Sequence, residues 1–370
     1  MRVLIAGGGT GGHVYPGLAL AEALKRACAD TLEVHWVGTA DRLEARAVPR
    51  AGLPFHTIDV TYLKGRRGAQ LAKAAARLPV AGGQTLALLA RLRPSAVVGV
   101  GGFASGPVGA AAAMLRVPLF LLEQNAHAGT TNRMLSRGAR VSYTSFDATS
   151  DQLHGEIVVA GNPIRRALME ASAARETREG GARRLLIIGG SQGARSLNEH
   201  TARLCADLRD GGVEVEIRHA AGRGREEAAA SAYHAAGVEA SVEPYIDDMA
   251  SAYAWSDLVV CRAGATTIAE LTALGIPALY VPFPHAADDH QTANARAVVE
   301  RGGGVMVSDD EYAQGSRASR ILTPLLKHPE VLARMGEAAK ALGRPDAGDR
   351  IARDLLQRIG APCRTDEVAA

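Results

Sequence analysis

Short apolar runs alternate with helix-spaced apolar positions along the whole chain. The pattern predicts strands at 2–6, 33–37, 96–100, 118–122, 141–144 and 157–160, and then at 184–188, 213–219, 258–261 and 277–281. Helical spacing lies between them, as at 84–92 and 266–274. Strands and helices that alternate at this spacing are typical of parallel sheets covered by helices on both faces.

The opening of the chain is repeated once. Residues 2–12 (RVLIAGGGTGG) align without a gap with residues 184–194 (RLLIIGGSQGA), and each copy is an apolar run, a glycine-rich turn and a helical segment. The repeat predicts two Rossmann-like, doubly wound α/β domains, 1–162 and 163–342, joined near 161–181. Their ligands are expected in a deep interdomain cleft, outside the carboxyl ends of the strands.

Composition excludes several classes of protein. With 47% hydrophobic and 22% charged residues in 370, the chain is neither disordered, collagen-like nor a coiled coil. Its four cysteines are far apart, which favours neither a disulfide framework nor a zinc site and fits a reducing cytosol. The first apolar run is too short for a signal peptide, and the longest uncharged stretch, 95–115, contains five glycines and Pro107, which argues against a spanning helix.

Charge is divided unevenly between the halves. Residues 1–162 carry 17 Lys+Arg against 10 Asp+Glu, whereas the remainder carries 25 against 29. No acidic residue lies between Asp59 and Glu123. The basic residues of that interval are Lys64, Arg66, Arg67, Lys73, Arg77, Arg91, Arg93 and Arg116. Such a surface attracts nucleic acid, anionic lipid or a phosphorylated substrate, unless the charges only solvate one face.

Two glycine clusters in the first half are candidates for binding phosphate. Residues 7–12 satisfy G-x-G-x-x-G, and residues 99–107 follow a predicted strand. Glycines let the backbone approach a phosphate at a helix start. A dinucleotide enzyme would have an acidic residue about 20 positions later, but Asp41 comes 29 residues after Gly12. His13 is either a helix-start residue that binds backbone or a general base or hydroxyl partner.

The second half offers a matching set. Residues 189–194 form another anion-binding turn, in which Ser191 adds a hydroxyl. Glu270 fits either a capping box with Thr267 or a carboxylate that binds a ribose diol. In the polar stretch 285–294, Gln291 and Asn294 suit sugar hydroxyls better than a metal ion. The chain has no D-x-D motif, so helix-terminus dipoles are expected to act on a leaving pyrophosphate.

These motifs together resemble the MurG family of bacterial peptidoglycan synthesis. The resemblance rests on 8–13, 101–107, 123–125, 161–165, 189–194 and 261–294, and it extends from Arg2 to about Arg358. It implies the GT-B fold, with a C-terminal helix at about 343–360 packing back on the first domain. It also implies an inverting transfer of GlcNAc from UDP-GlcNAc to the 4-hydroxyl of undecaprenyl-pyrophosphoryl-MurNAc-pentapeptide (lipid I), which gives the β-1,4-linked lipid II.

The resemblance assigns roles to individual residues. For the mechanism, His13 is our own first candidate for the base, with a role in binding the acceptor as the alternative. The backbone of Ile246 would read uracil, Glu270 the ribose, and Ser191 with the start of the helix at 265–267 the phosphates. The residues implied in donor binding are Thr10, Gly11, Gly12, Asn125, Arg165, Ser191, Ile246, Ala265, Thr266, Thr267, Ile268, Ala269, Glu270, Gln291 and Asn294. We expect Gly9, Gly102, Ser105 and Gly106 to line loops for the acceptor pyrophosphate.

The expected partners follow from the same assignment. They are UDP-GlcNAc, lipid I and an anionic membrane surface, with other cell-wall or cell-division proteins as further candidates and no nucleic acid. No metal or other cofactor is expected to be required, and stimulation by Mg²⁺ is left open. The first domain would lie on the cytoplasmic face of the inner membrane as a peripheral protein. The alternatives are a dinucleotide-dependent oxidoreductase, a related GT-B enzyme such as a UDP-GlcNAc 2-epimerase or a diacylglycerol glycosyltransferase, and a module that binds nucleotide sugars without catalysis.

Overall fold

The computed structural model describes residues 1–28, 31–60, 78–172, 181–190 and 193–361. The chain divides into two compact α/β units. Unit 1 comprises Met1–Arg165 and Asp346–Ala370, and unit 2 comprises Arg166–Pro345. Each unit is built around its own parallel sheet, as the repeated pattern predicts.

The described strands of unit 1 form one sheet in the order β3-β2-β1-β4-β5-β6-β7, and every neighbouring pair is parallel. The strands are β1 (Arg2–Ala6), β2 (Glu33–Gly38), β3 (Phe55–Thr57), β4 (Ala96–Gly99), β5 (Leu119–Glu123), β6 (Val141–Thr144) and β7 (Ile157–Val159). Val3 to Ala6 are completely buried. A parallel sheet covered on both faces requires such a continuous apolar run.

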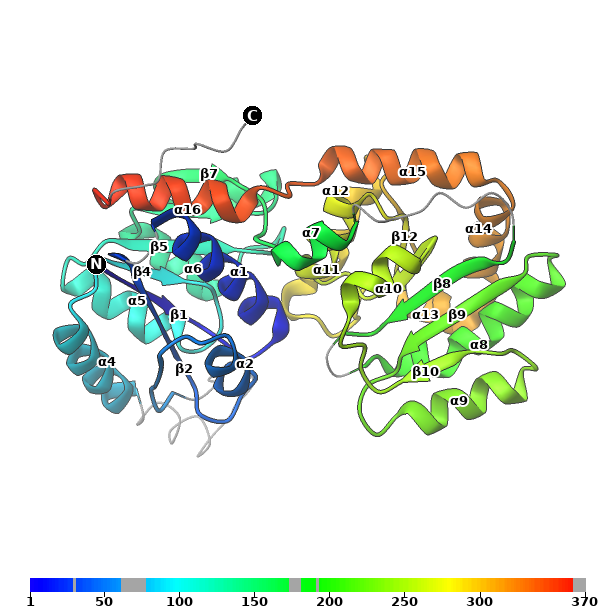
Figure 1. The fold of residues 1–370 in the computed structure, drawn as a ribbon, viewed down its shortest axis with the longest axis horizontal. Helices are drawn as coiled ribbons and strands as arrows, with labels where there is room; N and C mark the ends of the chain where they lie inside the picture. The colour runs from blue at the N-terminus through cyan, green and yellow to red at the C-terminus, as the bar shows by residue number, and fades with distance from the viewer. Residues whose placement is uncertain (29–30, 61–77, 173–180, 191–192, 362–370) are drawn as a thin grey trace. The chain divides into compact units, whose positions relative to one another are not determined.

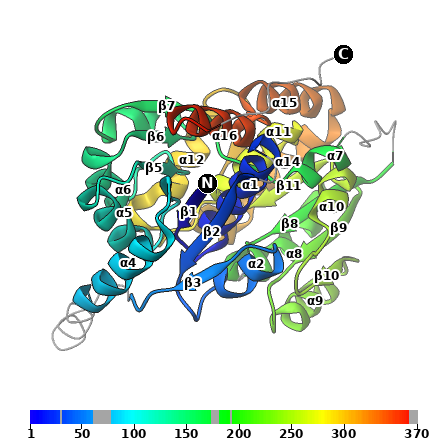
Figure 2. The ribbon, with the colours of Figure 1, turned by 60° about the vertical axis from the view of Figure 1, so that its left-hand side comes forward.

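Helices cover both faces of this sheet (Figures 1 and 2). They are α1 (Gly11–Cys28), α2 (Glu44–Arg50), α4 (Leu78–Leu92), α5 (Ser105–Met114), α6 (Thr130–Leu135) and α16 (Ala347–Arg358), with 3₁₀ turns η2 (Ser136–Gly138) and η3 (Asp147–Gln152). Leu20 of α1 and Leu355 of α16 share one core cluster, whereas Leu88 of α4 and Val108 of α5 belong to the cluster on the other face. The final helix thus packs beside the first, and the hydroxyl of Tyr143 on β6 donates to Asp354 at 2.6 Å.

Unit 2 repeats this plan with the strand order β10-β9-β8-β11-β12-β13, again parallel throughout. Its strands are β8 (Arg183–Ile188), β9 (Val215–Ala220), β10 (Ser241–Glu243), β11 (Leu258–Cys261), β12 (Ala278–Tyr280) and β13 (Val305–Met306). Its helices are α7 (Arg166–Ser172), α8 (Arg195–Asp210), α9 (Glu226–Ala235), α10 (Met249–Trp255), α11 (Ala265–Leu274), α12 (His290–Val299), α13 (Asp309–Gln314), α14 (Ser316–Lys327) and α15 (Pro329–Leu342), with the 3₁₀ turn η4 (Ala287–Asp289).

The predicted strands are confirmed, with ends that shift by one or two residues. The apolar pattern missed the edge strands β3, β10 and β13, which are two or three residues long. The equally short β7 and β12 lie within the apolar runs 157–160 and 277–281, whereas β3 (FHT) and β10 (SVE) contain polar residues and β13 (VM) has only two residues. Within the described ranges, no helix combines the length and the apolar character that crossing a membrane would require.

Candidate functional site

The strand order of each sheet defines a point where successive connections turn in opposite directions. In unit 1 this point lies between β1 and β4, and in unit 2 between β8 and β11. Open α/β sheets bind their ligands at this position, outside the carboxyl ends of the strands. The glycine clusters at 7–12 and 99–107 follow β1 and β4, while Gly189 and Gly190 follow β8 and the short segment 262–264 (RAG) follows β11. The candidate phosphate loops therefore lie at the switch points of their own sheets.

The two glycine loops of unit 1 interlock through their backbones. The amide of Gly8 donates to the carbonyl of Gly101 at 3.3 Å, and a Cβ on Gly102 would lie 2.1 Å from the carbonyl oxygen of Gly8. The Ser105 hydroxyl lies 2.6 Å from the carbonyl oxygen of Ala6 and 2.9 Å from that of Gly101. Ser105 is completely buried, and its hydroxyl ties the two loops together. Its place in a loop for the acceptor pyrophosphate stays a prediction.

The amides of the first loop are used inside the protein. Gly7 donates to the carbonyl of Val37 at 3.1 Å, and Gly9 donates to the carboxylate of Glu44 at 2.8 Å. An amide given to a buried carboxylate cannot also hold a phosphate. The amide of Gly9 is thus engaged inside the protein, and the place of Gly9 in a loop for the acceptor pyrophosphate stays a prediction. Gly102 and Gly106, both half-buried, keep that role as a prediction.

His13 is the third residue of α1 and is half-buried. Its Nδ1 lies 3.4 Å from the hydroxyl of the exposed Thr10, and its backbone amide donates to the carbonyl of Thr10 at 3.1 Å. A Cβ on Gly101 would lie 2.8 Å from Nε2, so the imidazole rests on the second glycine loop. The switch point of unit 1 thus carries an imidazole with a hydroxyl beside it.

Two further predicted residues of unit 1 are held by neighbours. The guanidinium carbon of Arg165 lies 5.2 Å from the ring centroid of Tyr15 on α1, a cation–π arrangement. Asn125 donates its backbone amide and its side-chain amide to Oε1 of Glu123, at 3.1 and 3.4 Å. Glu123 also accepts the amide of Gly129, so its carboxylate caps the loop that presents Asn125.

In unit 2, the structure excludes the capping-box interpretation of Glu270. Helix α11 begins after Gly264, and Thr267 lies inside the helix instead of at its cap. Glu270 is 7% exposed, and its Oε2 accepts the hydroxyl of the buried Tyr253 at 2.8 Å. The carboxylate is therefore oriented by a tyrosine, and the residues at 265–269 form the first turn and a half of the same helix.

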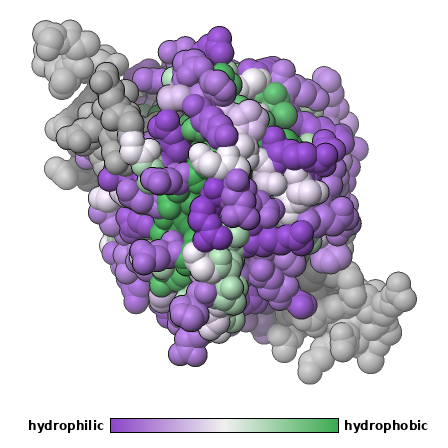
Figure 3. All heavy atoms as spheres, turned by 90° about the vertical axis from the view of Figure 1, so that its right-hand side faces the viewer, coloured by the Kyte–Doolittle hydropathy of each residue, from purple (hydrophilic) through white to green (hydrophobic). Residues whose placement is uncertain are grey.

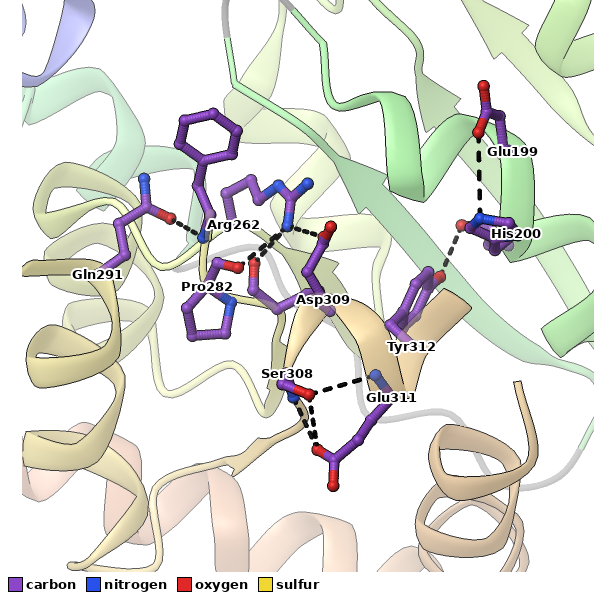
Figure 4. Close-up of polar contacts among 12 residues, drawn as sticks. Glu199, His200, Arg262, Pro282, Gln291, Ser308, Asp309, Glu311 and Tyr312 are labelled. Carbon is purple, nitrogen blue, oxygen red and sulfur yellow. Dashed lines mark hydrogen bonds and ion pairs between the residues drawn. The ribbon is translucent and has the colours of Figure 1, made fainter. Parts of the chain in front are cut away.

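Asn294 and Gln291 both bind backbone next to this helix. Asn294 is completely buried and donates to the carbonyl of Ala263 at 3.2 Å, so it supports the loop before α11. Its contact with a sugar hydroxyl stays a prediction. Gln291, half-buried on α12, accepts the amide of Phe283 at 2.9 Å (Figure 4). Sequence reasoning placed both residues near the donor but did not foresee these backbone contacts.

Arg262 holds the segment that Gln291 contacts. Its Nη1 donates to the carbonyls of Val281 and Pro282 at 3.1 and 3.2 Å and to the carboxylate of Asp309, and the guanidinium lies over the ring of Phe283 (Figure 4). Arg262 is 9% exposed. The loop after β12 is thereby tied to the starts of α12 and α13.

The predictions for Ile246 and Ser191 stay predictions. Ile246 lies in the loop before α10 with its side chain buried. Ser191 lies outside the described residues. Across the parts of the chain that are described, no three His, Cys, Asp or Glu side chains come together as a metal site would need.

The residues that sequence reasoning missed all position other groups. Glu44 binds Gly9, Tyr15 stacks on Arg165, Tyr253 binds Glu270, and Arg262 anchors the loop at 281–283. A sequence signal existed only for Glu44 and Arg262. Arg262 directly follows the buried strand β11, and Glu44 lies six residues after β2, so each charge needs a nearby partner.

Comparison with protein families gives two matches that cover most of the chain. The N-terminal domain model of glycosyltransferase family 28 matches residues 3–144, and the C-terminal domain model of the same family matches residues 184–351. The chain is 43% identical over 357 residues to the UDP-N-acetylglucosamine–N-acetylmuramyl-(pentapeptide) pyrophosphoryl-undecaprenol N-acetylglucosamine transferase of Aeromonas hydrophila, with 96% of each chain covered. It is 44% identical to the transferase of that name from Xanthomonas euvesicatoria, with 97% of this chain and 81% of the relative covered.

Solved structures show the same relationship. The crystal structure of Acinetobacter baumannii MurG superimposes with a TM-score of 0.78 at 32% identity, over 96% of this chain and 99% of that one. UDP-GlcNAc 2-epimerase from Neisseria meningitidis, bound to UDP-GlcNAc, gives a TM-score of 0.64 at 13% identity, over 96% of this chain and 100% of that one. The second likeness concerns the fold alone.

Proposed function

The chain belongs to the MurG family within glycosyltransferase family 28, and we propose on this basis that it transfers GlcNAc from UDP-GlcNAc to undecaprenyl-pyrophosphoryl-MurNAc-pentapeptide. The muramyl 4-hydroxyl is the acceptor, and the product is the β-1,4-linked disaccharide lipid of peptidoglycan synthesis. The observation that carries the proposal is the pair of glycine-loop sites at the two switch points, one with His13 and one with Glu270.

The reaction is a single displacement with inversion. The acceptor hydroxyl attacks the anomeric carbon, the bond from that carbon to the UDP oxygen breaks, and the hydroxyl proton passes to a base. His13 is the candidate base, because an imidazole titrates near neutrality. The Thr10 hydroxyl at 3.4 Å from Nδ1 and the close contact with Gly101 restrict how the ring can turn.

Unit 2 binds the donor in this proposal. The start of α11 at Ala265–Thr267 supplies backbone amides and the positive end of a helix dipole for the diphosphate. Fixed dipoles aimed at the leaving UDP lower the barrier without reorganising during the reaction. Glu270, oriented by Tyr253, accepts hydrogen bonds from the ribose hydroxyls, while Gln291 and Arg165 are candidates for contacts with the sugar and the phosphates. No metal or other cofactor is required in this mechanism.

Unit 1 faces the membrane in the proposed arrangement. Its neighbouring helices α4, α5 and α6 expose large apolar side chains, among them Val80, Met114 at 76% and Met134 at 67%. Arg91, Arg93, Arg116, Arg137 and Arg140 are exposed on or beside the same helices. Apolar side chains that enter the lipid interface, combined with cations that bind anionic headgroups, give peripheral attachment. The other basic residues of this interval, from Lys64 to Arg77, lie outside the described residues.

Unit 2 has a different surface. Its exposed large apolar side chains are Tyr245 and Phe283, as far as the described residues go. The face shown in Figure 3 is mainly hydrophilic, with only a narrow band of hydrophobic atoms. We therefore assign membrane contact to unit 1 and not to unit 2.

The decisive experiment incubates the purified chain with radiolabelled UDP-GlcNAc and a short-chain lipid-linked muramyl-pentapeptide. We expect a labelled disaccharide lipid and stoichiometric UDP, and we expect His13→Ala to remove most turnover while it leaves UDP binding intact. Labelled N-acetylmannosamine in place of the disaccharide would assign the chain to the epimerases instead. Near-normal turnover of the His13→Ala variant with an unchanged pH profile would exclude His13 as the base.

A further inference from the structure

Glu44 is a buried carboxylate at the centre of the first glycine loop. It is the first residue of α2, follows β2 by six residues and is 1% exposed. Its Oε2 accepts the amide of Gly9 at 2.8 Å, and its Oε1 accepts the amide and the hydroxyl of Thr39 at 3.1 and 2.7 Å. Burying a carboxylate costs free energy unless its oxygens accept hydrogen bonds. The three donors to Glu44 offset that cost.

The surrounding backbone is shaped to admit this side chain. A Cβ built on Gly8 would lie 2.1 Å from the carboxyl carbon of Glu44, and one on Gly38 would lie 2.6 Å from its Cγ. Any side chain at either glycine would occupy the space that Glu44 fills. The loop after β1, the end of β2 and the start of α2 thus form one close-packed seat for the carboxylate.

The carboxylate takes up a glycine-loop amide of the kind that a dinucleotide-binding protein offers to a pyrophosphate. In such proteins the amides of the glycine loop after the first strand bind the phosphates directly. Here Gly9 gives its amide to Glu44, while Gly7 and Gly8 give theirs to the carbonyls of Val37 and Gly101. A phosphate bound to the same amides would also be repelled by the negative charge of the Glu44 carboxylate.

We propose that Glu44 is a positioning residue, a built-in anion that holds the loop at 7–12 in the conformation that presents His13. Gly9 has a φ of +96°, and His13 follows it by four residues at the start of α1. Three consecutive glycines would otherwise sample many conformations. The bond from Gly9 to Glu44 selects one of them, and the imidazole is placed against Gly101 as a result. The inference rests on the proposed transfer reaction, in which His13 acts on the acceptor hydroxyl.

The test compares Glu44→Ala with Glu44→Gln and with a matched control, Glu22→Ala. Glu22 is an exposed glutamate on α1 that pairs with Arg26 at 2.8 Å. We expect Glu44→Ala to lower kcat about 100-fold, as a misplaced group does. The KM for UDP-GlcNAc should change far less than kcat, because Glu270 and the start of α11, which hold the nucleotide in the proposed function, lie in unit 2. Glu22→Ala should leave both parameters unchanged.

Two further measurements separate positioning from general loss of structure. Formate or acetate should restore part of the kcat of Glu44→Ala by filling the vacated seat, and should do nothing for the parent or for Glu22→Ala. Hydrogen exchange should show faster exchange of the amides at 9–13 in Glu44→Ala, with the strands of unit 1 unchanged. Glu44→Gln keeps the shape but offers one acceptor oxygen in place of two, so its kcat should fall between those of the parent and the alanine variant.

The proposal is overturned if Glu44→Ala or Glu44→Gln turns over like the parent, or if exchange rises throughout unit 1 in both variants. A parent chain that transfers no GlcNAc would refute the proposed function instead. In that case the exchange of residues 9–13 alone decides whether Glu44 holds the loop.

Discussion

The imidazole of His13 lies against the backbone of Gly101, so that a β-carbon at residue 101 would come within 2.6 Å of the ring carbon Cδ2. The two residues belong to different glycine loops, one after β1 and one after β4. Gly101 also accepts the amide of Gly8. The imidazole of His13 therefore packs directly against the backbone of Gly101, which leaves room for the ring because glycine has no side chain.

Replacing Gly101 with alanine should displace His13. Gly101 has a φ of +91°, so the variant is strained as well as crowded. We expect kcat to fall about 100-fold, because a shift of about 1 Å in a reacting group has an effect of that size. The measurement is steady-state turnover with both substrates, together with the melting temperature.

Gly52→Ala is the matched control for that variant. Gly52 also has a positive φ, +67°, but a Cβ there would have no heavy atom within 4 Å. It should cost about 1 kcal/mol of stability, as a left-handed alanine does, and leave turnover unchanged. Equal turnover of the two variants would show that the contact with Gly101 does not matter to His13.

Tyr253→Phe should weaken the binding of UDP through Glu270. The hydroxyl of Tyr253 donates to Oε2 of Glu270, and its loss leaves a buried carboxylate oxygen without that donor. A hydrogen bond of this kind contributes about 1 kcal/mol, or about fivefold in Kd. Isothermal titration calorimetry measures the Kd for UDP. The Glu270→Ala variant should bind UDP more weakly than Tyr253→Phe does.

Tyr312→Phe provides the control for Tyr253→Phe. Tyr312 is also buried in unit 2, but its hydroxyl lies 2.7 Å from Thr201. Its variant should lose stability without losing affinity for UDP. Equal affinities in both variants would remove Tyr253 from the donor site.

Acid should destabilise the fold through His219. The ring is completely buried between the hydroxyl of Tyr233 and Oδ1 of Asn198, and burial lowers its pKa to about 4. The unfolded chain, with an ordinary pKa of 6.5, takes up the proton first. The stability that the neutral ring contributes is therefore complete above pH 6.5 and is lost as the pH falls towards 4, by about 3 kcal/mol.

Urea unfolding at pH 7.5, 6 and 5 checks this expectation, with His219→Gln as the comparison. The glutamine stays neutral, so the variant should be less stable at pH 7.5 but should lose less stability on acidification. Parallel pH dependences of the two proteins would show that His219 does not titrate in this window.

Membrane attachment should depend on unit 1. Changing Arg91, Arg93 and Arg116 to Glu, or Met114 and Met134 to Glu, should reduce sedimentation with vesicles that contain anionic lipid. Each lysine or arginine near such a surface contributes about 1 kcal/mol, and the effect weakens with salt. Arg223→Glu, at an exposed position in unit 2, should have no effect. Unchanged sedimentation of the unit 1 variants would refute the attachment.

The alternation of apolar runs and glycine turns was sufficient to predict the architecture. The copies at 2–12 and 184–194 became β1 and β8 with the helices that follow them, because buried parallel strands need uninterrupted apolar runs and close turns need glycine. The same pattern places His13 after β1, at the switch point of its sheet, because residues that follow such strands come to that edge.

The tertiary structure alone decided which polar groups of these motifs bind other parts of the protein. Gly9, Ser105 and Asn294 match ligand-binding motifs, yet each gives its donor to the protein itself: to Glu44, to the carbonyls of Ala6 and Gly101, and to the carbonyl of Ala263. These bonds join segments up to 99 residues apart along the chain. A hydrogen bond depends on where two atoms meet after folding, and the order of residues along the chain does not contain that distance.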